Sequence, residues 1–200
     1  MRRAIAIVIV LASFVAGCGG AKSSSGEWKR HDVPEGNASI LLPPKWEVLD
    51  DFDPETISDF TEENAEFAPY VEQLIENDVF KLFAIDPDIR DEFATNVNVI
   101  VVPVNVPLRE WVAQENPATE RIAVPGSLQS TFVGTPGGEA ARSSWLLEIQ
   151  SKGQMRTVRS FQFLFRHESN GYVFTFSTLP EHAARYEATF TRAAQSIRFG

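Results

Sequence analysis

Residues 139–178 read EAARSSWLLEIQSKGQMRTVRSFQFLFRHESNGYVFTFST, and this stretch decides the fold. Runs of β-branched and aromatic residues between short turn signals predict three strands, at 139–150, 155–167 and 172–178. Asn170-Gly171 suits a hairpin whose turn residues have positive backbone dihedrals. Side chains alternate along a strand, so five aromatic residues fall on matching faces of the second and third strands: Phe161, Phe163, Phe165, Phe174 and Phe176. Their pairing across the hairpin predicts an aromatic core.

Four further strands are expected toward the N-terminus. Alternating apolar residues between turn signals predict them at 27–33, 38–42, 79–86 and 94–104. The strand at 94–104 carries apolar side chains on both sides, so we expect it to be central in its sheet. Pro43-Pro44 leaves no amide for a sheet ladder, so the chain is expected to leave the sheet there.

Apolar residues at helical spacing complete the pattern. They predict helices at 107–116 and 180–195, and two helical pieces across 53–75 whose other face is acidic. A short strand is expected at 120–124 and a tight turn at 134–138. With no internal repeat and no linker between domains, the sequence predicts a single domain of mixed helices and strands.

The chain is acidic, with a formal net charge of -9. A field of this sign disfavours nucleic acid and anionic lipid headgroups as partners, because both require clustered Lys and Arg to neutralise phosphate. Fifteen Phe and four Trp are enough for one packed core at this length.

Residues 1–17 have the layout of a cleavable secretory signal, with two arginines, an apolar run and then small residues. Val15-Ala16-Gly17-Cys18 resembles the lipobox of bacterial lipoproteins, which implies transfer of diacylglycerol to the Cys18 thiol and cleavage before it. The alternative is an ordinary signal peptide with an unrelated cysteine. We expect 18–26 to be a lipidated cysteine and flexible tether, and 27–200 to be the folded domain. The protein is then extracytoplasmic and anchored to the cell membrane by lipid.

Four short motifs follow one another in a familiar order. They are Leu42-Pro43-Pro44-Lys45-Trp46, Asn96-Val97-Asn98-Val99, the helix from Leu108 to Val112, and Gly171-Tyr172-Val173-Phe174-Thr175-Phe176 before the final helix. This order resembles the Mog1/PsbP-like superfamily, including actinobacterial LpqN-type lipoproteins. The resemblance implies an α+β fold, with an antiparallel β-sheet and helices on both faces in an α/β/α sandwich. It also implies a protein that binds or assembles rather than catalyses, and it carries over no site residues.

The densest acidic stretch is a candidate docking surface for a basic partner. Its members are Asp51, Asp53, Glu55, Asp59, Glu62 and Glu63. The alternative is a solvated helix face with carboxylates placed favourably near helix starts.

Metal and catalytic chemistry find little support in the sequence. Three histidines lie far apart and lack the spacing of a metal clamp: His31, His167 and His182. Surface positions are expected for them, with a distant assembly that includes Glu ligands left open. Four carboxylates after a strand do not match a calcium loop, and a solvated turn is expected: Asp86, Asp88, Asp91 and Glu92. Without a free thiol or a Gly-x-Ser-x-Gly elbow, the chain is predicted to be non-catalytic, with no metal and no cofactor.

Two functions from different classes remain. The first is a binding, adaptor or assembly domain for another envelope protein. The second is a carrier or sensor of a small apolar, lipid-like ligand held between sheet and helices. The tryptophans can line such a pocket or simply pack the core: Trp28, Trp46, Trp111 and Trp145.

Overall fold

The computed structural model describes residues 26–34, 36–49, 62, 80–151 and 153–200. The expected signal peptide, Cys18 and, apart from Glu62, the helical pieces expected across 53–75 lie outside the described residues. Within the part that is described, no helix is long and apolar enough to cross a membrane.

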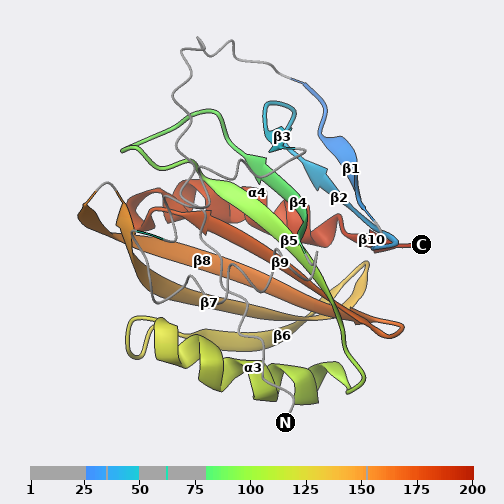
Figure 1. Cartoon of the computed structure of the whole chain (residues 1–200). Helices are drawn as coiled ribbons and strands as arrows, with labels where there is room; N and C mark the ends of the chain where they lie inside the picture. The colour runs from blue at the N-terminus through green and yellow to red at the C-terminus, as the bar shows by residue number, and fades with distance from the viewer. Residues whose placement is uncertain (1–25, 35, 50–61, 63–79, 152) are drawn as a thin grey trace.

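Ten strands are described, and together they form two antiparallel sheets (Figure 1). The main sheet contains β3 (Glu47–Leu49), β4 (Phe80–Ile85), β5 (Asn96–Pro103), β6 (Gln129–Thr135), β7 (Gly138–Ser151), β8 (Gln154–His167) and β9 (Asn170–Thr178). Its spatial order is β3-β4-β5-β9-β8-β7-β6. The small sheet contains β1 (Lys29–Val33), β2 (Ala38–Leu42) and β10 (Arg198–Phe199), in the order β1-β2-β10. The predicted strands at 27–33, 38–42, 79–86 and 94–104 are confirmed, and β5 has a strand on each side as expected.

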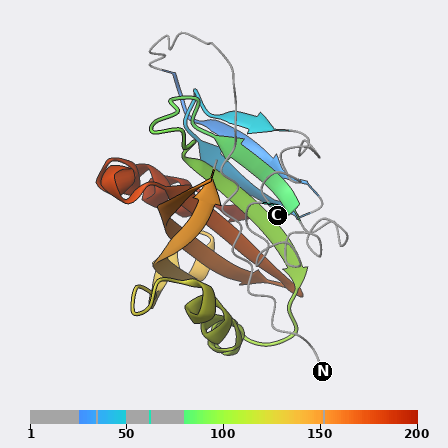
Figure 2. The ribbon, with the colours of Figure 1, turned by 60° about the vertical axis from the view of Figure 1, so that its left-hand side comes forward.

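Two helices cover opposite faces of the main sheet, as Figures 1 and 2 show. We call these faces the α3 face, covered by α3 (Leu108–Ile122), and the α4 face, covered by α4 (Ala183–Gln195) after the short helix η1 (Pro180–His182). On the α3 face, Trp111 and Val112 pack in one core with Trp145 and Leu147. The fold is therefore α+β, in a single domain with helices on both sides of an antiparallel sheet.

The predicted aromatic core lies on the α4 face. In the β8–β9 hairpin Phe163 pairs with Phe174, and the rings of neighbouring rungs meet edge to face. Ring centroids are 6.1 Å apart for Phe163 and Phe176, and 5.9 Å apart for Phe165 and Phe174. Phe190 of α4 stacks on Phe176 at 5.0 Å, which fixes the helix over this part of the sheet.

The helix α3 is longer than the sequence predicts, and the strand expected at 120–124 is wrong. The helix continues through Pro117 to Ile122. Pro117 cannot donate to the carbonyl of Ala113, but both residues are exposed, so water can satisfy that carbonyl. Beyond the proline, Ala118 and Thr119 are buried against the sheet. Tertiary packing of this face therefore outweighs the local helix-breaking signal.

The turn predicted at Asn170-Gly171 is also misplaced. The turn residues are Glu168 and Ser169, with Glu168 at φ 53°, whereas Asn170 and Gly171 belong to β9 and do not have positive φ. Gly171 is required for close packing, because a Cβ there would lie 2.6 Å from the Trp111 ring. The absence of a side chain at Gly171 therefore lets α3 pack closely on the sheet, and this glycine is not a turn residue of the hairpin.

The strand β6 has no counterpart among the predicted elements. Its sequence QSTFVGT shows no clear alternation, yet all seven residues pair with β7. The turn expected at 134–138 is confirmed as the hairpin between these two strands. Pairing with a long neighbour therefore decides the conformation of β6.

Candidate functional site

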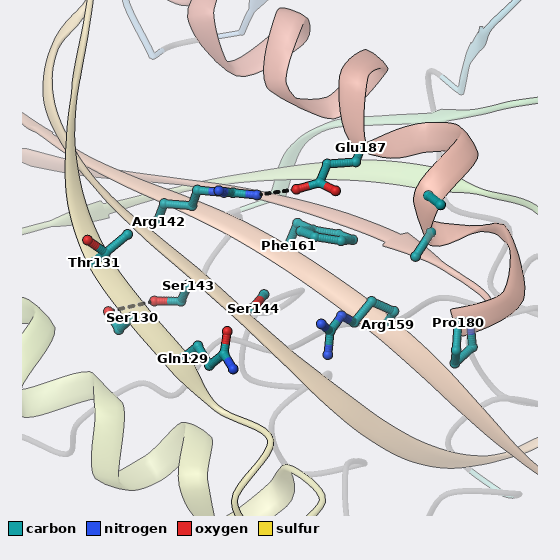
Figure 3. A pocket seen from close by; sticks show the side chains of 12 residues that line it. Gln129, Ser130, Thr131, Arg142, Ser143, Ser144, Arg159, Phe161, Pro180 and Glu187 are labelled. Carbon is teal, nitrogen blue, oxygen red and sulfur yellow. Dashed lines mark hydrogen bonds and ion pairs between the residues drawn. The ribbon is translucent and has the colours of Figure 1, made fainter.

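An open groove of about 670 Å³ lies on the α4 face, where the helix does not cover the sheet (Figure 3). Its floor comes from β6, β7 and β8, and its wall from η1 and the first turns of α4. The lining residues are Gln129, Ser130, Thr131, Arg142, Ser143, Ser144, Arg159, Phe161, Pro180, Ala183, Ala184 and Glu187.

The floor follows from strand register. Directly paired residues share a face, and Gln129 pairs with Ser144 while Thr131 pairs with Arg142. Because α4 packs on β2, β8 and β9, the polar ends of β6 and β7 stay open to solvent. The groove floor is therefore built from three neighbouring strands, of which β7 and β8 are predicted from sequence and β6 is not.

The floor carries two arginines, Arg142 and Arg159, in a chain whose net charge is -9. Arg142 Nη2 donates to Glu187 Oε1 at 2.8 Å, which links floor and wall. Among the described residues Arg159 has no carboxylate partner, and its guanidinium lies 5.7 Å from the Phe161 ring centroid. Guanidinium, hydroxyl and amide groups on this floor are donors suited to a polar or anionic occupant.

The candidate acidic docking surface is mostly beyond the structure. Asp51, Asp53, Glu55, Asp59 and Glu63 lie outside the described residues. Glu62 is described, as an exposed helical residue.

The carboxylates after β4 are held by partners within the chain. Three of them contact η1 or the start of α4. Tyr186 Oη donates to Asp86 Oδ2 at 2.8 Å, and Arg185 Nη2 donates to Asp88 at 2.9 Å. His182 Nε2 lies 3.3 Å from Asp91. Glu92 pairs with Arg156 at 2.7 Å, and Lys45 pairs with the buried Asp86 at 3.2 Å. Asp91 and Glu92 form an exposed turn as expected, whereas Asp86 is buried. The contacts also fix α4 to the sheet, and we call residues 86–92 with 182–186 the acidic clasp.

Ionisation within the acidic clasp follows from these contacts. Hydrogen bonds from Arg90 and Arg185 lower the pKa of Asp88. Burial, together with the hydrogen bond to Asp86, raises the pKa of Tyr186 to about 12.

The histidines are not equivalent. Asp91, Glu181 and His182 bring one ligand atom each within 4.8 Å of one another, so the distant assembly left open by the sequence does form, at an exposed position. His167 stacks on Phe199 with ring centroids 4.8 Å apart. Burial and the charge of Lys29 lower the pKa of His31.

Sequence reasoning also missed a buried polar rung on the α3 face. Trp145 pairs with Ser160, and Ser160 pairs with Ser177, across β7, β8 and β9. All three are fully buried, and among the described residues Trp145 Nε1, Ser160 Oγ and Ser177 Oγ find no hydrogen-bond partner. Side-chain alternation along β8 could have indicated this rung, because Ser160 and Gln162 lie between the apolar Val158 and Leu164 on the face opposite the Phe residues.

The tryptophans pack in the cores rather than around the groove. Trp46 is buried in the α4-face core, and Trp111 and Trp145 are buried in the α3-face core. Trp28 is half-buried, with the Arg192 guanidinium 4.1 Å from its ring centroid.

Neither a protein-family model nor a curated relative matches this chain. Several solved structures match this chain. Cyanobacterial PsbP (CyanoP) from Synechocystis sp. PCC 6803 is 12% identical with a TM-score of 0.51, over 93% of this chain and 99% of that one. LpqN of Mycobacterium tuberculosis, described as involved in cell envelope biogenesis, is 9% identical with a TM-score of 0.49, over 86% and 90%. The Ran-binding protein Mog1p of Saccharomyces cerevisiae is 11% identical with a TM-score of 0.49, over 88% and 96%.

At these identities the likeness concerns the fold alone. The sheet order, the helix on each face and the near-complete coverage of CyanoP agree with the architecture that the sequence motifs imply. The chain therefore has the Mog1/PsbP-like fold.

Proposed function

We propose that this chain is a lipid-anchored envelope protein of the LpqN type whose folded domain binds another protein in the groove beside α4. The groove is the observation that carries the proposal. It is open and lined by hydrogen-bond donors, and it is bordered by β6, the edge strand of the main sheet. A segment of a partner chain suits such a site better than an apolar molecule, which requires an enclosed and largely apolar pocket.

The anchor is a separate part of the proposal, and the lipobox-like Val15-Ala16-Gly17-Cys18 supports it. Lipid attachment would hold the domain at the membrane surface, since two acyl chains bind stably where one does not. Replacement of Cys18 by Ala should leave the protein unlipidated and uncleaved by the lipoprotein pathway, which changes its mature mass. Unchanged partitioning and unchanged mature mass would contradict the anchor without affecting the groove.

Site-specific photocrosslinking in the intact envelope tests the groove. A photoreactive amino acid at Thr131 or Ser144 on the groove floor should capture the same partner. The matched control is Gln114, which is exposed on α3, on the opposite side of the sheet. Capture of the same species at Gln114, or none at the two groove positions, would contradict protein binding in the groove.

A second candidate, carriage of a lipid-like ligand, is favoured by the buried polar rung. Trp145, Ser160 and Ser177 present polar atoms in an apolar core, and an acceptor on a bound molecule would satisfy them. Native mass spectrometry of the purified protein tests this function. Extra mass that is lost on denaturation would support it, and a bare polypeptide mass would leave ordered water as the partner of these atoms.

A further inference from the structure

The strand β6 ends the main sheet, and no strand of the described part of the chain pairs with its outer edge. Its seven residues pair with β7, and no backbone hydrogen bond joins 129–135 to any other described segment. Because hydrogen-bonded and non-hydrogen-bonded pairs alternate along an antiparallel ladder, about half of its N–H and C=O groups point away from β7.

This edge lacks the features that usually prevent pairing with another chain. Short length, charged side chains and proline protect natural edge strands. The opposite edge of the sheet, β3, has three residues and begins with Glu47. In contrast, β6 has seven residues, none of them charged and none of them proline.

The two faces beside this edge differ. On the α3 face, Phe132 is covered by Arg109, whose guanidinium lies 4.1 Å from the ring centroid and pairs with Glu139 at 2.6 Å. On the α4 face, Gln129 and Thr131 open directly into the groove. A chain running along β6 would therefore place every second side chain toward the groove.

The charge of the groove then indicates which side chains the added strand should carry. A strand added to β6 would lie two strand spacings from β7, about 10 Å, which the combined lengths of a Glu and an Arg side chain can span. Arg142 is the cation at that distance, and its present partner Glu187 is 55% exposed and so can be displaced. Arg159, one strand further in, adds positive potential without a carboxylate of its own among the described residues.

We propose that β6 accepts an extended segment of a partner protein as an additional strand, and that carboxylates on this segment bind Arg142 in competition with Glu187. The inference rests on the proposed function and names the partner chemistry of the same groove. Main-chain hydrogen bonds supply the attachment, and the groove side chains supply the preference. A second copy of the chain is a poorer occupant, because two acidic molecules of net charge -9 repel each other.

Three synthetic heptapeptides test the proposal on the purified protein: Thr-Glu-Val-Glu-Val-Glu-Thr, its version with Gln in place of Glu, and the acidic peptide with alternate amides methylated. Amide exchange at 129–135 is followed by NMR. At saturation the acidic peptide should slow exchange of the outward amides at least about tenfold. The methylated peptide should give no protection, because it lacks the donors.

Two variants test the competition. Glu187→Gln should tighten binding of the acidic peptide about two- to fivefold and leave the Gln peptide unchanged, since exposed ion pairs contribute at this level. Arg142→Gln should remove the preference for the acidic peptide. If the Arg142–Glu187 pair has only a structural role, Glu187→Gln will not tighten binding of the acidic peptide.

Several outcomes would overturn the inference: no binding at millimolar peptide, binding that leaves 129–135 unprotected, or equal affinity for both charged and uncharged peptides. Protection that rises with protein concentration alone would identify a second copy as the occupant. Capture at Thr131 in the envelope combined with any of these results would retain protein binding in the groove and reject strand addition.

Discussion

On the central strands β8 and β9, the two faces of the main sheet are both buried but differ in chemistry. On β8 and β9 the α4 face carries Phe161, Phe163 and Phe165 against Phe174 and Phe176, all at most 6% exposed. The α3 face of the same strands carries Ser160, Gln162, Thr175 and Ser177, which are also at most 6% exposed. Burial alone therefore does not require apolar residues, but each buried polar atom then needs a specific partner.

The largest effect should follow removal of an aromatic ring from the α4 face. Phe174→Ala should lower the free energy of unfolding by about 3–5 kcal/mol, because the ring is fully buried and its removal leaves a cavity that its neighbours fill only in part. Urea denaturation measures the change. Met155→Ala, at a side chain that is 60% exposed, is the control and should have little effect. A loss below about 1 kcal/mol would mean that this face is loosely packed.

A smaller loss is expected where α3 approaches the sheet. Gly171→Ala places a Cβ 2.5 Å from Val104 Cγ2 and 2.6 Å from Trp111, so we expect a loss of about 1–3 kcal/mol from overpacking. The control is Gly134→Ala in β6, where a Cβ meets nothing within 4 Å. Equal melting temperatures for the two variants would contradict close packing at Gly171.

Substitutions of the polar side chains on the α3 face should fall into two groups by their effect on stability. Gln162 Nε2 donates to Thr175 Oγ1 at 3.1 Å, so Thr175→Val should lower stability by about 1–2 kcal/mol. Ser160→Ala removes a hydroxyl that has no partner among the described residues and should be close to neutral. If Ser160→Ala is as destabilising as Thr175→Val in denaturant titrations, the Ser160 hydroxyl is engaged by a bound group.

The smallest effect is expected in the acidic clasp, because Asp88 is partly exposed. Its pKa is lowered, so its contribution is present above the ordinary value near 3.8 and is lost as the pH falls through the lowered value. Asp88→Asn should therefore cost less than about 1 kcal/mol at neutral pH, and this difference should disappear in acid. A difference that persists unchanged in strongly acidic urea titrations would assign the effect to packing instead.

The predictable part of the structure is the part governed by local pattern. The β7–β8–β9 meander and its Phe face follow from side-chain alternation, and the final helix follows from apolar spacing. The end of α3 and the strand β6 were not predictable in this way. Pro117 argues against a helix that packing nonetheless stabilises, and β6 is a strand because β7 offers it a partner.

The groove was still less accessible to sequence reasoning. Gln129 and Thr131 are ordinary polar residues of an unpredicted strand, and Arg142 and Glu187 are 45 positions apart in the chain. Asp86, Asp88 and Asp91 lie close together in the sequence, but their partners in η1 and α4 lie about a hundred residues away.

By itself the sequence determined the acidic charge, the pattern at residues 1–18 from which a lipoprotein signal is predicted, and the order of elements that implies a Mog1/PsbP-like fold. These depend on composition and on spacing between neighbours, which the chain carries at every stage of folding. Only the tertiary structure decided the position of β6 at the end of the described sheet, the arginine-containing groove beside α4 and the buried polar rung. Each of these arises where residues distant in sequence are brought into register by strand pairing and helix packing, and no local pattern encodes that register.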